Sequence, residues 1–248
     1  MVDQLERTWM VRSFFVLNCN SITISLKNHK TFCYLFFLLF PLVSFGQVEK
    51  TDPIGGERIR WNKSLTHDTA YKFNKNPNTL LMETVRGLKP GKALDLGMGQ
   101  GRNSIYLAMK GWDDTGVDIA DEAVAFALKQ AKENKVNIHT HNIPMETFDF
   151  GIHEWDLIVH VYEGCFDDSR VGKIVKALKP GGILVFEFFH REAGIEMKRP
   201  TFGCETNLVK STVEKADAFK ILRYSEEVGI ADYGLKNYKL VKLVAAKK

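Results

Sequence analysis

The sequence has little cysteine and no paired cysteine motif. Its 248 residues include four cysteines, Cys19, Cys33, Cys165 and Cys204. They lie far apart, and no two are separated by only two residues, so neither a zinc site nor a redox dithiol is indicated. We therefore expect ordinary buried or free thiols and no bound metal.

The chain also lacks a strong charge of either sign. It carries 34 lysines and arginines against 30 aspartates and glutamates, a formal net charge of +4. No run of basic residues approaches the dense clusters that mark nucleic-acid or anionic-membrane surfaces. We expect no nucleic-acid partner.

A long membrane-spanning run is absent, although the N-terminus contains a shorter apolar one. Lys27, His29 and Lys30 precede an uncharged stretch, 31–46, that ends Ser44-Phe45-Gly46. A basic flank, an apolar core and a small-x-small ending are typical of a signal peptide cleaved here before Gln47. We expect residues 1–46 to be signal-peptide-like, with export or membrane tethering as the result.

The length of the chain before Lys27, including Asp3 and Glu6, does not fit a simple signal peptide. An upstream start codon taken for the true one explains the extra length, and so does an uncleaved segment that tethers the chain to a membrane. A merely unstructured extension on a cytoplasmic protein is the remaining alternative.

The next segment, 47–89, is predicted to be an arm followed by a cap helix. Pro53, Gly55 and Gly56 are expected to break any early element. Asn76 followed by Pro77 is typical of a helix start, and apolar residues then recur at helical spacing. The aromatic residues of the arm in 70–74 need a surface to pack on, which either a lid over the site or docking on the sheet edge would provide.

From residue 90 to 248 short apolar runs alternate with helical patterns, as in βαβ units and a largely parallel sheet. Strands are expected at 92–96, 114–118, 136–140, 155–161 and 183–189, and two more at 219–224 and 238–245. The run 155–161 is continuously apolar, as expected for a central strand covered on both faces. The segment 190–212 shows little periodicity and is predicted to be a long connection near the site.

A glycine-rich loop follows the first of these strands. Asp95 ends the strand, and Gly97, Gly99 and Gly101 follow at alternate positions. Glycine permits the positive φ angles of a tight turn and lets a ligand approach the backbone. The turn also aims the first amides of the next helix at that ligand. The loop is therefore predicted to be the floor of a binding site.

A dinucleotide-binding fold is the main competitor, because its fingerprint is also glycine-rich. The pattern GxGxxG starting at Gly97 requires glycine at position 102, where the sequence has Arg102. Asp95 also suits a cationic amine, whereas it would repel a pyrophosphate. A nicotinamide-dependent oxidoreductase is therefore the second hypothesis.

An acid also ends the second predicted strand. In open α/β sheets ligands lie outside the carboxyl ends of the strands, where an acid such as Asp118 accepts both hydroxyls of a ribose. A purely structural role for Asp118 as a helix cap is not needed, because Asp121 can cap the helix that follows the second strand. Together with the glycine loop, Asp118 indicates nucleoside binding.

These motifs, with 155–158 (WDLI) and 178–184 (LKPGGIL), resemble the class I S-adenosylmethionine-dependent methyltransferases. The run 99–108 (GQGRNSIYLA) resembles their small-molecule branch of tellurite- and thiopurine-type enzymes. The resemblance implies a Rossmann-like seven-stranded, mostly parallel sheet with helices on both faces and an antiparallel C-terminal strand. It also implies that S-adenosylmethionine is the cofactor, with its methionine part on the loop, its ribose on Asp118 and its adenine beside Ile119. The implied loop contacts are Asp95, Gly97, Met98, Gly99, Gly101 and Asn103.

One position departs from the family pattern. An acid commonly follows the third strand to meet the adenine amino group, and this sequence offers Asn142 instead. An amide oxygen still accepts that hydrogen bond, so Asn142 is included among the predicted cofactor contacts.

Catalysis requires little of the protein beyond holding an acceptor in line with the sulfonium methyl, since a dedicated base is optional. A base, if used, belongs at the ends of the fourth and fifth strands, at His160, Tyr162, Glu163 or His190. We take Tyr162 and His160 as the catalytic candidates, although both residues also suit purely structural roles. The acceptor is predicted to be a small molecule; a non-catalytic, exported cofactor-binding domain is a further alternative.

Overall fold

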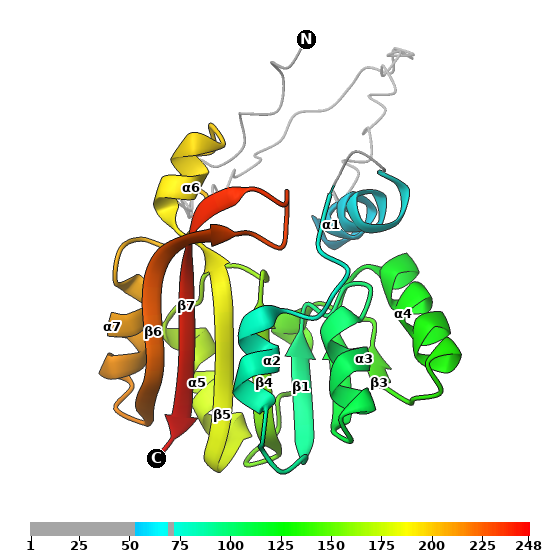
Figure 1. The fold of residues 1–248 in the computed structure, drawn as a ribbon, viewed down its shortest axis with the longest axis horizontal. Coiled ribbons are helices and arrows are strands. Elements are labelled where there is room, and N and C mark those ends of the chain that lie inside the picture. The colour runs from blue at the N-terminus through cyan, green and yellow to red at the C-terminus, as the bar shows by residue number, and fades with distance from the viewer. Residues whose placement is uncertain (1–52, 69–71) are drawn as a thin grey trace, which may run out of the picture. The chain divides into compact units, whose positions relative to one another are not determined.

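The computed structural model describes residues 53–68 and 72–248, whose central feature is a seven-stranded sheet (Figure 1). The strand order is β3-β2-β1-β4-β5-β7-β6. Parallel pairing joins β1 to β2 and β4, β2 to β3, and β4 to β5, whereas β7 runs antiparallel to β5 and β6. The strands are β1 (Lys92–Leu96), β2 (Asp113–Val117), β3 (His139–His141), β4 (Trp155–Val161), β5 (Leu178–Phe189), β6 (Phe219–Ile230) and β7 (Asn237–Lys247). The predicted fold class is confirmed.

Helices cover both faces of this sheet (Figure 1). Their apolar sides bury the strands, and Leu157, Ile158 and Val159 of β4 are fully inaccessible to solvent. The continuous apolar run therefore did mark a central strand covered on both faces. The helices are α1 (Pro53–Asn62), π-helix η1 (Lys63–His67), α2 (Thr79–Val85), α3 (Arg102–Met109), α4 (Asp121–Glu133), 3₁₀-helix η2 (Met145–Thr147), α5 (Asp168–Ala177), α6 (Arg191–Glu196) and α7 (Leu208–Lys215).

The start of the arm is helical, contrary to the prediction that Pro53, Gly55 and Gly56 would break any element there. All three lie in the first turn of α1. Proline is tolerated at the first helical position, where its missing N–H has no intrahelical partner. The next helix also begins later than predicted, because Asn78 rather than Asn76 is its cap and accepts a hydrogen bond from the Leu81 N–H at 3.1 Å.

The segment 190–212 belongs to a long connection between β5 and β6, as predicted, but it is partly helical. Helices α6 and α7 occupy much of it, and the His190 side chain caps α6 by accepting a hydrogen bond from the Glu192 N–H. Gly194 allows the chain to turn back on itself, since a Cβ there would collide with the Phe202 backbone. Tight local packing of this kind leaves no clear period in the sequence.

Strand ends differ where tertiary packing overrides the apolar pattern. Strand β3 begins at His139, later than predicted, because Val136 and Ile138 pack beside α4 residues instead. Strand β6 extends well beyond 219–224, to Ile230, whereas β7 exceeds the predicted 238–245 by only one residue at its start and two at its end. Together they form a long antiparallel hairpin closed by the turn 231–236. Backbone pairing in such a hairpin does not require apolar side chains on every residue.

A disulfide joins Cys165 and Cys204, which corrects the expectation of ordinary buried or free thiols at these two positions. The two cysteines are 39 residues apart in sequence. They meet because Cys165 follows β4, while Cys204 forms an isolated bridge with His190 at the end of the neighbouring strand β5. Because the sheet topology brings these two cysteines together, no local sequence pattern predicts that they form a disulfide.

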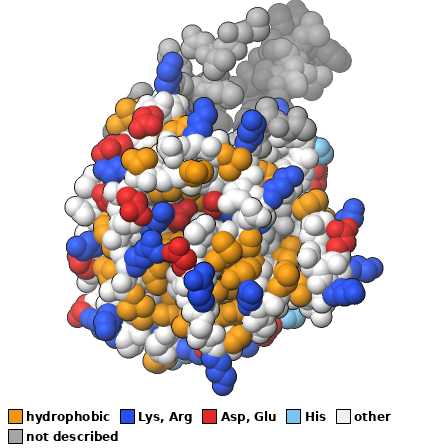
Figure 2. Space-filling model, in the orientation of Figure 1, with side chains coloured by type: hydrophobic (Ala, Val, Ile, Leu, Met, Phe, Trp, Pro, Cys, Tyr) orange, Lys and Arg blue, Asp and Glu red, His pale blue; other side chains and the backbone are white. Residues whose placement is uncertain are grey.

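Charges of both signs are mixed on the face shown in Figure 2, where lysine and arginine side chains alternate with acidic ones rather than forming one patch. Within 53–68 and 72–248 no helix is long and apolar enough to cross a membrane. The predicted signal-like segment, residues 1–46, lies outside the described residues.

Candidate active site

The glycine loop between β1 and α3 forms the floor of the site. Gly97, Gly99 and Gly101 have φ angles of 71°, 52° and 76°, in the left-handed region that favours glycine. The N–H groups of Gly97 and Met98 donate to the Val117 carbonyl at 2.9 and 3.2 Å, which ties the loop to the end of β2. At Gly101 the reason for glycine is packing, since a Cβ would lie 2.7 Å from that of Ala127 on α4.

Asp118 lies beside this floor, directly after β2. Its two carboxylate oxygens accept hydrogen bonds from the N–H groups of Gly99 and Ala120, each at 2.7 Å. Burial raises the pKa of Asp118, while these backbone hydrogen bonds lower it. Each oxygen accepts one hydrogen bond and has a second lone pair for a ligand.

The floor opens into a cavity of about 290 Å³. Five of the predicted site residues line it: Gly97, Gly99, Asp118, Ile119 and Tyr162. The sheet topology brings them together, because the carboxyl ends of the parallel strands β1, β2 and β4 lie at one edge. The other lining residues are Glu57, Trp61, Leu65, Val117, Pro144, Met145, Glu146, Glu163 and Tyr233.

Asp95 lies beneath the floor and does not line the cavity. It is 2% exposed and accepts a hydrogen bond from Ser104 Oγ at 2.9 Å. Burial raises the pKa of Asp95 to about 7. Met98 is also buried, and its side chain lies against Gly116, where a Cβ would collide with the sulfur. These two side chains support the loop from below.

Asn103 and Asn142 likewise lie outside the cavity lining. Asn103 is buried, and its Oδ1 accepts a hydrogen bond from the Asn78 N–H at 2.9 Å. Asn142 is exposed and donates through Nδ2 to the Asp118 carbonyl at 3.0 Å. Asn142 therefore borders the end of β2, close to the position where the family pattern has an acid.

The two catalytic candidates occupy different environments. His160 is fully buried against the rings of Phe166 and Phe186, and burial lowers its pKa to about 3. Tyr162 lines the cavity, and its hydroxyl accepts a hydrogen bond from the Asp232 N–H at 3.0 Å. Only the tyrosine is placed to touch a bound molecule.

The roof of the cavity comes from α1 and η1, through Trp61 and Leu65, and from Tyr233 in the β6–β7 turn. The Leu65 carbonyl accepts a hydrogen bond from Gln100 Nε2 of the glycine loop at 2.8 Å, so the floor holds the roof. Phe73 of the predicted lid stacks on Tyr233, with 6.0 Å between ring centroids. Ala70 and Tyr71 of that lid lie outside the described residues.

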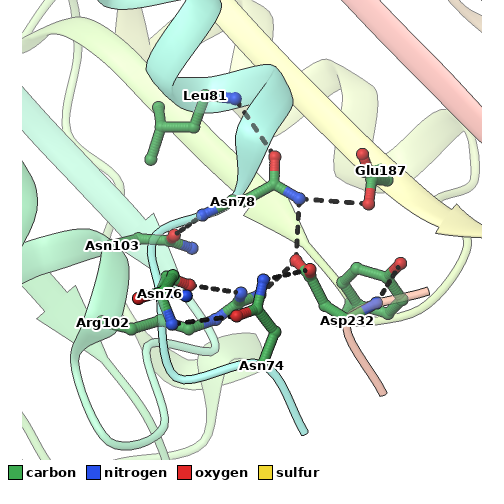
Figure 3. A network of polar contacts seen from close by, with 9 residues as sticks. Asn74, Asn76, Asn78, Leu81, Arg102, Asn103, Glu187 and Asp232 are labelled. Carbon is green, nitrogen blue, oxygen red and sulfur yellow. Dashed lines mark hydrogen bonds and ion pairs between the residues drawn. The ribbon is translucent and has the colours of Figure 1, made fainter. Parts of the chain in front are cut away.

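A buried polar network fixes the roof turn to the floor helix (Figure 3). The Asp232 carboxylate accepts hydrogen bonds from Arg102 Nη2 at 2.7 Å and from the Asn74 and Asn78 side chains, each at 2.9 Å. The Arg102 and Asp232 side chains are only 12% and 9% exposed. Asn78 also donates to Glu187 on β5 at 3.1 Å, so four separate segments converge on this point.

Comparison with known proteins places the chain in a family. Residues 66–243 match the family model described as tellurite resistance protein TehB. The chain belongs to the TehB family. A Haemophilus influenzae relative named as a probable S-adenosyl-L-methionine-dependent methyltransferase TehB is 32% identical over 113 residues, 43% of this chain and 39% of that protein. The chain thus matches well under two thirds of the length of this relative.

More distant relatives and solved structures agree. A ubiquinone biosynthesis O-methyltransferase of Bordetella avium is 29% identical over 53% of this chain and 56% of that protein. N-methyltransferase NodS of Bradyrhizobium japonicum, solved with S-adenosyl-L-homocysteine, shares the fold with a TM-score of 0.60 and 18% identity over 77% of this chain and 97% of that one. The Haemophilus influenzae TehB structure has a TM-score of 0.56 and 23% identity over 68% of this chain and 61% of that one. The resemblance predicted from the motifs is confirmed.

Sequence reasoning missed most of the roof. Trp61 and Leu65 lie in a segment predicted to be irregular, and Tyr233 lies in a turn that carries no motif. Their only signal was the general one that aromatic and apolar side chains in polar segments need a surface to pack on.

Proposed function

We propose that this chain is an S-adenosylmethionine-dependent methyltransferase that acts on a small-molecule acceptor by in-line methyl transfer. The observation that carries the proposal is the convergence of the glycine loop and the Asp118 carboxylate on one cavity at the carboxyl ends of β1 and β2. Membership of the TehB family supports it, since relatives in that family are named as methyltransferases of this kind.

The residues present fit such a cofactor. Gly97 and Gly99 expose bare backbone at the floor, where a side chain would occupy the approach of the methionine part. Asp118 has a free lone pair on each oxygen for the ribose hydroxyls, and Ile119 provides an apolar wall for the base. Bound S-adenosylmethionine supplies a methyl group already activated by its sulfonium charge.

The protein's own task is to position the acceptor and to exclude water. Trp61, Leu65 and Tyr233 cover the cavity; the Arg102–Asp232 pair holds the turn that carries Tyr233, and Gln100 holds Leu65. Orientation of two reactants in one enclosed site lowers a barrier by roughly 7 to 11 kcal/mol in favourable cases. A small-molecule acceptor is in line with relatives named as a ubiquinone biosynthesis O-methyltransferase and as N-methyltransferase NodS.

Calorimetric titration with S-adenosylhomocysteine tests the proposal. We expect binding by the unmodified chain and at least a tenfold loss in Asp118→Asn, because the ribose loses a charged acceptor. Asp113→Asn, an exposed acid at the opposite end of β2, is the matched control and should bind normally. Absence of heat with both S-adenosylmethionine and its demethylated product, or binding of NADH in their place, would overturn the proposal.

We also propose that residues 1–46 direct the chain out of the cytosol. The Cys165–Cys204 disulfide supports this, because structural disulfides persist mainly in oxidising compartments. Mass spectrometry of the mature protein from its native host tests the idea. A new N-terminus at Gln47 is expected, an intact Met1 in a membrane fraction would indicate a tether, and an intact soluble cytosolic chain would refute export.

A further inference from the structure

Strand β6 lies at the outer edge of the sheet (Figure 1). Its backbone pairs with β7 along 219–230, and among the described residues no other segment forms a backbone hydrogen bond with this strand. In an antiparallel pair, every second residue directs its N–H and C=O groups away from the neighbouring strand. The outer side of β6 therefore presents a row of backbone donors and acceptors that can pair with a further strand.

Helix α7 packs on one face of β6 through side chains. The Lys210 ammonium lies 5.9 Å from the centre of the Tyr224 ring, and the Asn207 N–H donates to Glu226 Oε1 at 2.6 Å. Residues 224 and 226 share a face because successive side chains of a strand alternate between its two faces. No backbone hydrogen bond joins α7 to β6, so the helix leaves the outer backbone groups of the strand open.

The exposed side chains along this edge are apolar to an unusual degree. Leu222, Val228 and Ile230 are 52%, 71% and 70% exposed. A bulge near Leu222 leaves 223–230 as the regular part of the edge. Edge strands of soluble proteins are usually guarded by prolines or lysines, and this part of β6 contains neither. Exposed apolar side chains beside open backbone groups indicate a surface that another strand covers.

The charges along β6 are complementary to those of a second copy of the same strand. Arg223 lies two residues before Ser225 and Glu227 lies two residues after it, on the same face. When two copies pair antiparallel about a two-fold axis through Ser225, Arg223 of each copy lies directly opposite Glu227 of the other. Opposite charges in directly opposed positions of an antiparallel pair attract each other. In the same register Leu222 of one copy comes next to Val228 of the other, so these apolar side chains are covered as well.

Both charged side chains are accessible for these contacts. The Arg223 side chain is 45% exposed, and its Nη1 donates to Glu83 at 2.7 Å. The Glu227 side chain is 51% exposed, and its Oε1 accepts from Lys242 at 3.4 Å. A guanidinium has five N–H donors and a carboxylate has two oxygens, so each group can bind a second partner while it keeps the first.

Other registers lose this complementarity. A shift by one residue brings together side chains from opposite faces of the two strands. A two-fold axis through Glu226 places two glutamates opposite each other, and an axis through Tyr224 places Arg223 opposite Ser225. Of these three axes, the one through Ser225 alone sets both charges in pairs.

We propose that two copies of this chain associate edge to edge through β6, antiparallel about Ser225. Their seven-stranded sheets then form one continuous sheet of fourteen strands. The contact is two-fold symmetric, so each cross-strand ion pair occurs twice. Strand β6 leads directly into the turn 231–236, which carries Tyr233, so the association also supports the roof of the cavity.

Sedimentation equilibrium of the full chain tests this interface. We expect a reversible dimer with twice the mass of the chain. Arg223→Glu and Glu227→Arg should each raise its dissociation constant at least about tenfold, because like charges then lie opposite each other. The double variant exchanges the two charges and should restore the wild-type constant to within about threefold. Glu83→Gln, which removes the intrachain partner of Arg223 without changing the edge, is the matched control and should dimerise as wild type.

A mixture of the two single variants tests the pairing of the charges. Chains with Arg223→Glu carry two acids at these positions, and chains with Glu227→Arg carry two bases. Each variant alone should be largely monomeric, whereas the equimolar mixture should form a heterodimer. A mixture that stays monomeric would overturn the proposal. A wild-type chain that is monomeric throughout the micromolar range, or a dimer that both single variants leave unchanged, would do the same.

Cross-linking locates the two-fold axis. Directly opposed Cα atoms in an antiparallel pair lie about 4.5 to 5.5 Å apart, a distance that a disulfide can span. With oxidised glutathione as the oxidant, Ser225→Cys should form an intermolecular disulfide between the two copies of position 225, identified by mass spectrometry. Ser211→Cys, an exposed position on α7, is the control and should link far more slowly. Equal rates for the two variants would contradict an axis through Ser225.

Discussion

The floor and the roof of the cavity are built in different ways. The floor is one short loop, 97–101, whose shape follows from glycines with positive φ and from hydrogen bonds to the adjoining end of β2. The roof combines helix α1, the π-helix η1 and the turn 231–236, which are distant in sequence and meet through side chains. Local backbone rules therefore determine the floor, whereas long-range polar and aromatic contacts determine the roof.

Because the floor and the roof are built differently, substitutions in them should affect different properties of the protein. Substitutions at Gly97 and Gly99 in the floor should impair ligand binding with modest effects on stability, because the loop is short and these two glycines line the cavity. Substitutions in the polar network that holds the roof should reduce stability first, because they leave buried polar groups without partners.

The largest expected effect is on the roof. Asp232→Ala leaves the Arg102 guanidinium buried without its carboxylate, which should lower the free energy of unfolding by about 3 to 5 kcal/mol. Urea unfolding of the variant and of the wild type measures this difference in the free energy of unfolding. Asp217→Ala, whose partner Lys248 is also at the surface, is the control and should change stability by less than about 1 kcal/mol. Equal losses in the two variants would show that the network does not hold the roof.

The floor should show its own dependence on pH. Burial raises the pKa of Asp95 to about 7, above its value in an unfolded chain, so the folded state binds more protons between about pH 4 and pH 7. Stability is then greatest at low pH within this window and falls as pH rises through the folded pKa. We expect Asp95 to account for roughly 2 kcal/mol of the stability that the ligand-free protein loses between pH 5.5 and pH 8, measured by urea unfolding as the difference between wild type and Asp95→Asn.

The same experiment has a matched pair of variants. Asp95→Asn, which removes the titrating group beneath the loop, should reduce the fall in stability with pH by that amount, whereas other buried acids such as Asp114 continue to contribute. Asp149→Asn, an exposed acid in the β3–β4 connection, should leave it unchanged. A pH profile that is the same in all three proteins would contradict the assignment to Asp95.

Ligand binding should respond to the floor glycine. Gly97→Ala places a methyl group in the cavity at a φ of 71° and should weaken S-adenosylhomocysteine binding by roughly tenfold to a hundredfold. Gly87→Ala is the control, because it has a φ of 82° with open space around the added Cβ. Both should lose about 1 kcal/mol of stability, and only the first should lose affinity in calorimetry. Similar affinities would mean that the ligand does not touch this glycine.

The smallest expected effect is at the aromatic part of the roof. Trp61→Ala removes one side of the cover while leaving the network around Asp232 intact, so ligand affinity should fall by about threefold to tenfold with little change in stability. Ile59→Ala, an exposed residue on the same helix, should have no effect on binding. A large drop in melting temperature for Trp61→Ala would show that the roof depends on apolar packing more than on its polar anchors.

Sequence predicted the floor well because its signals are local. The bounds of β1 and β4 agree with the predicted 92–96 and 155–161, and Gly97, Gly99, Asp118 and Ile119 line the cavity as expected of neighbouring strand ends. Alternation of apolar runs with helical periods also determined the parallel part of the sheet.

The remaining parts depended on contacts between distant residues. Helix α1 has neither an apolar stripe nor an acid in its first turn, so the sequence pattern does not predict it. Its last residue, Asn62, donates a hydrogen bond to Asp121 at the start of α4. The Cys165–Cys204 bond and the partners of Asp232 arise only after β4, β5 and the β6–β7 hairpin have assembled. Asp95 was predicted as a ligand contact from its place in the motif, but its side-chain direction depends on Ser104 of the next helix.

Arg102 gives the glycine loop a second significance. It occupies the position where a dinucleotide fingerprint needs glycine, and the same side chain binds Asp232 at the far edge of the roof. Arg102→Gly, the change that would complete the other fingerprint, would therefore leave the buried Asp232 carboxylate without its cation and weaken the anchoring of the turn that carries Tyr233. Arg102 therefore belongs both to the glycine-loop motif and to the contacts that close the cavity. A substitution that changes the motif also changes the anchoring of the roof.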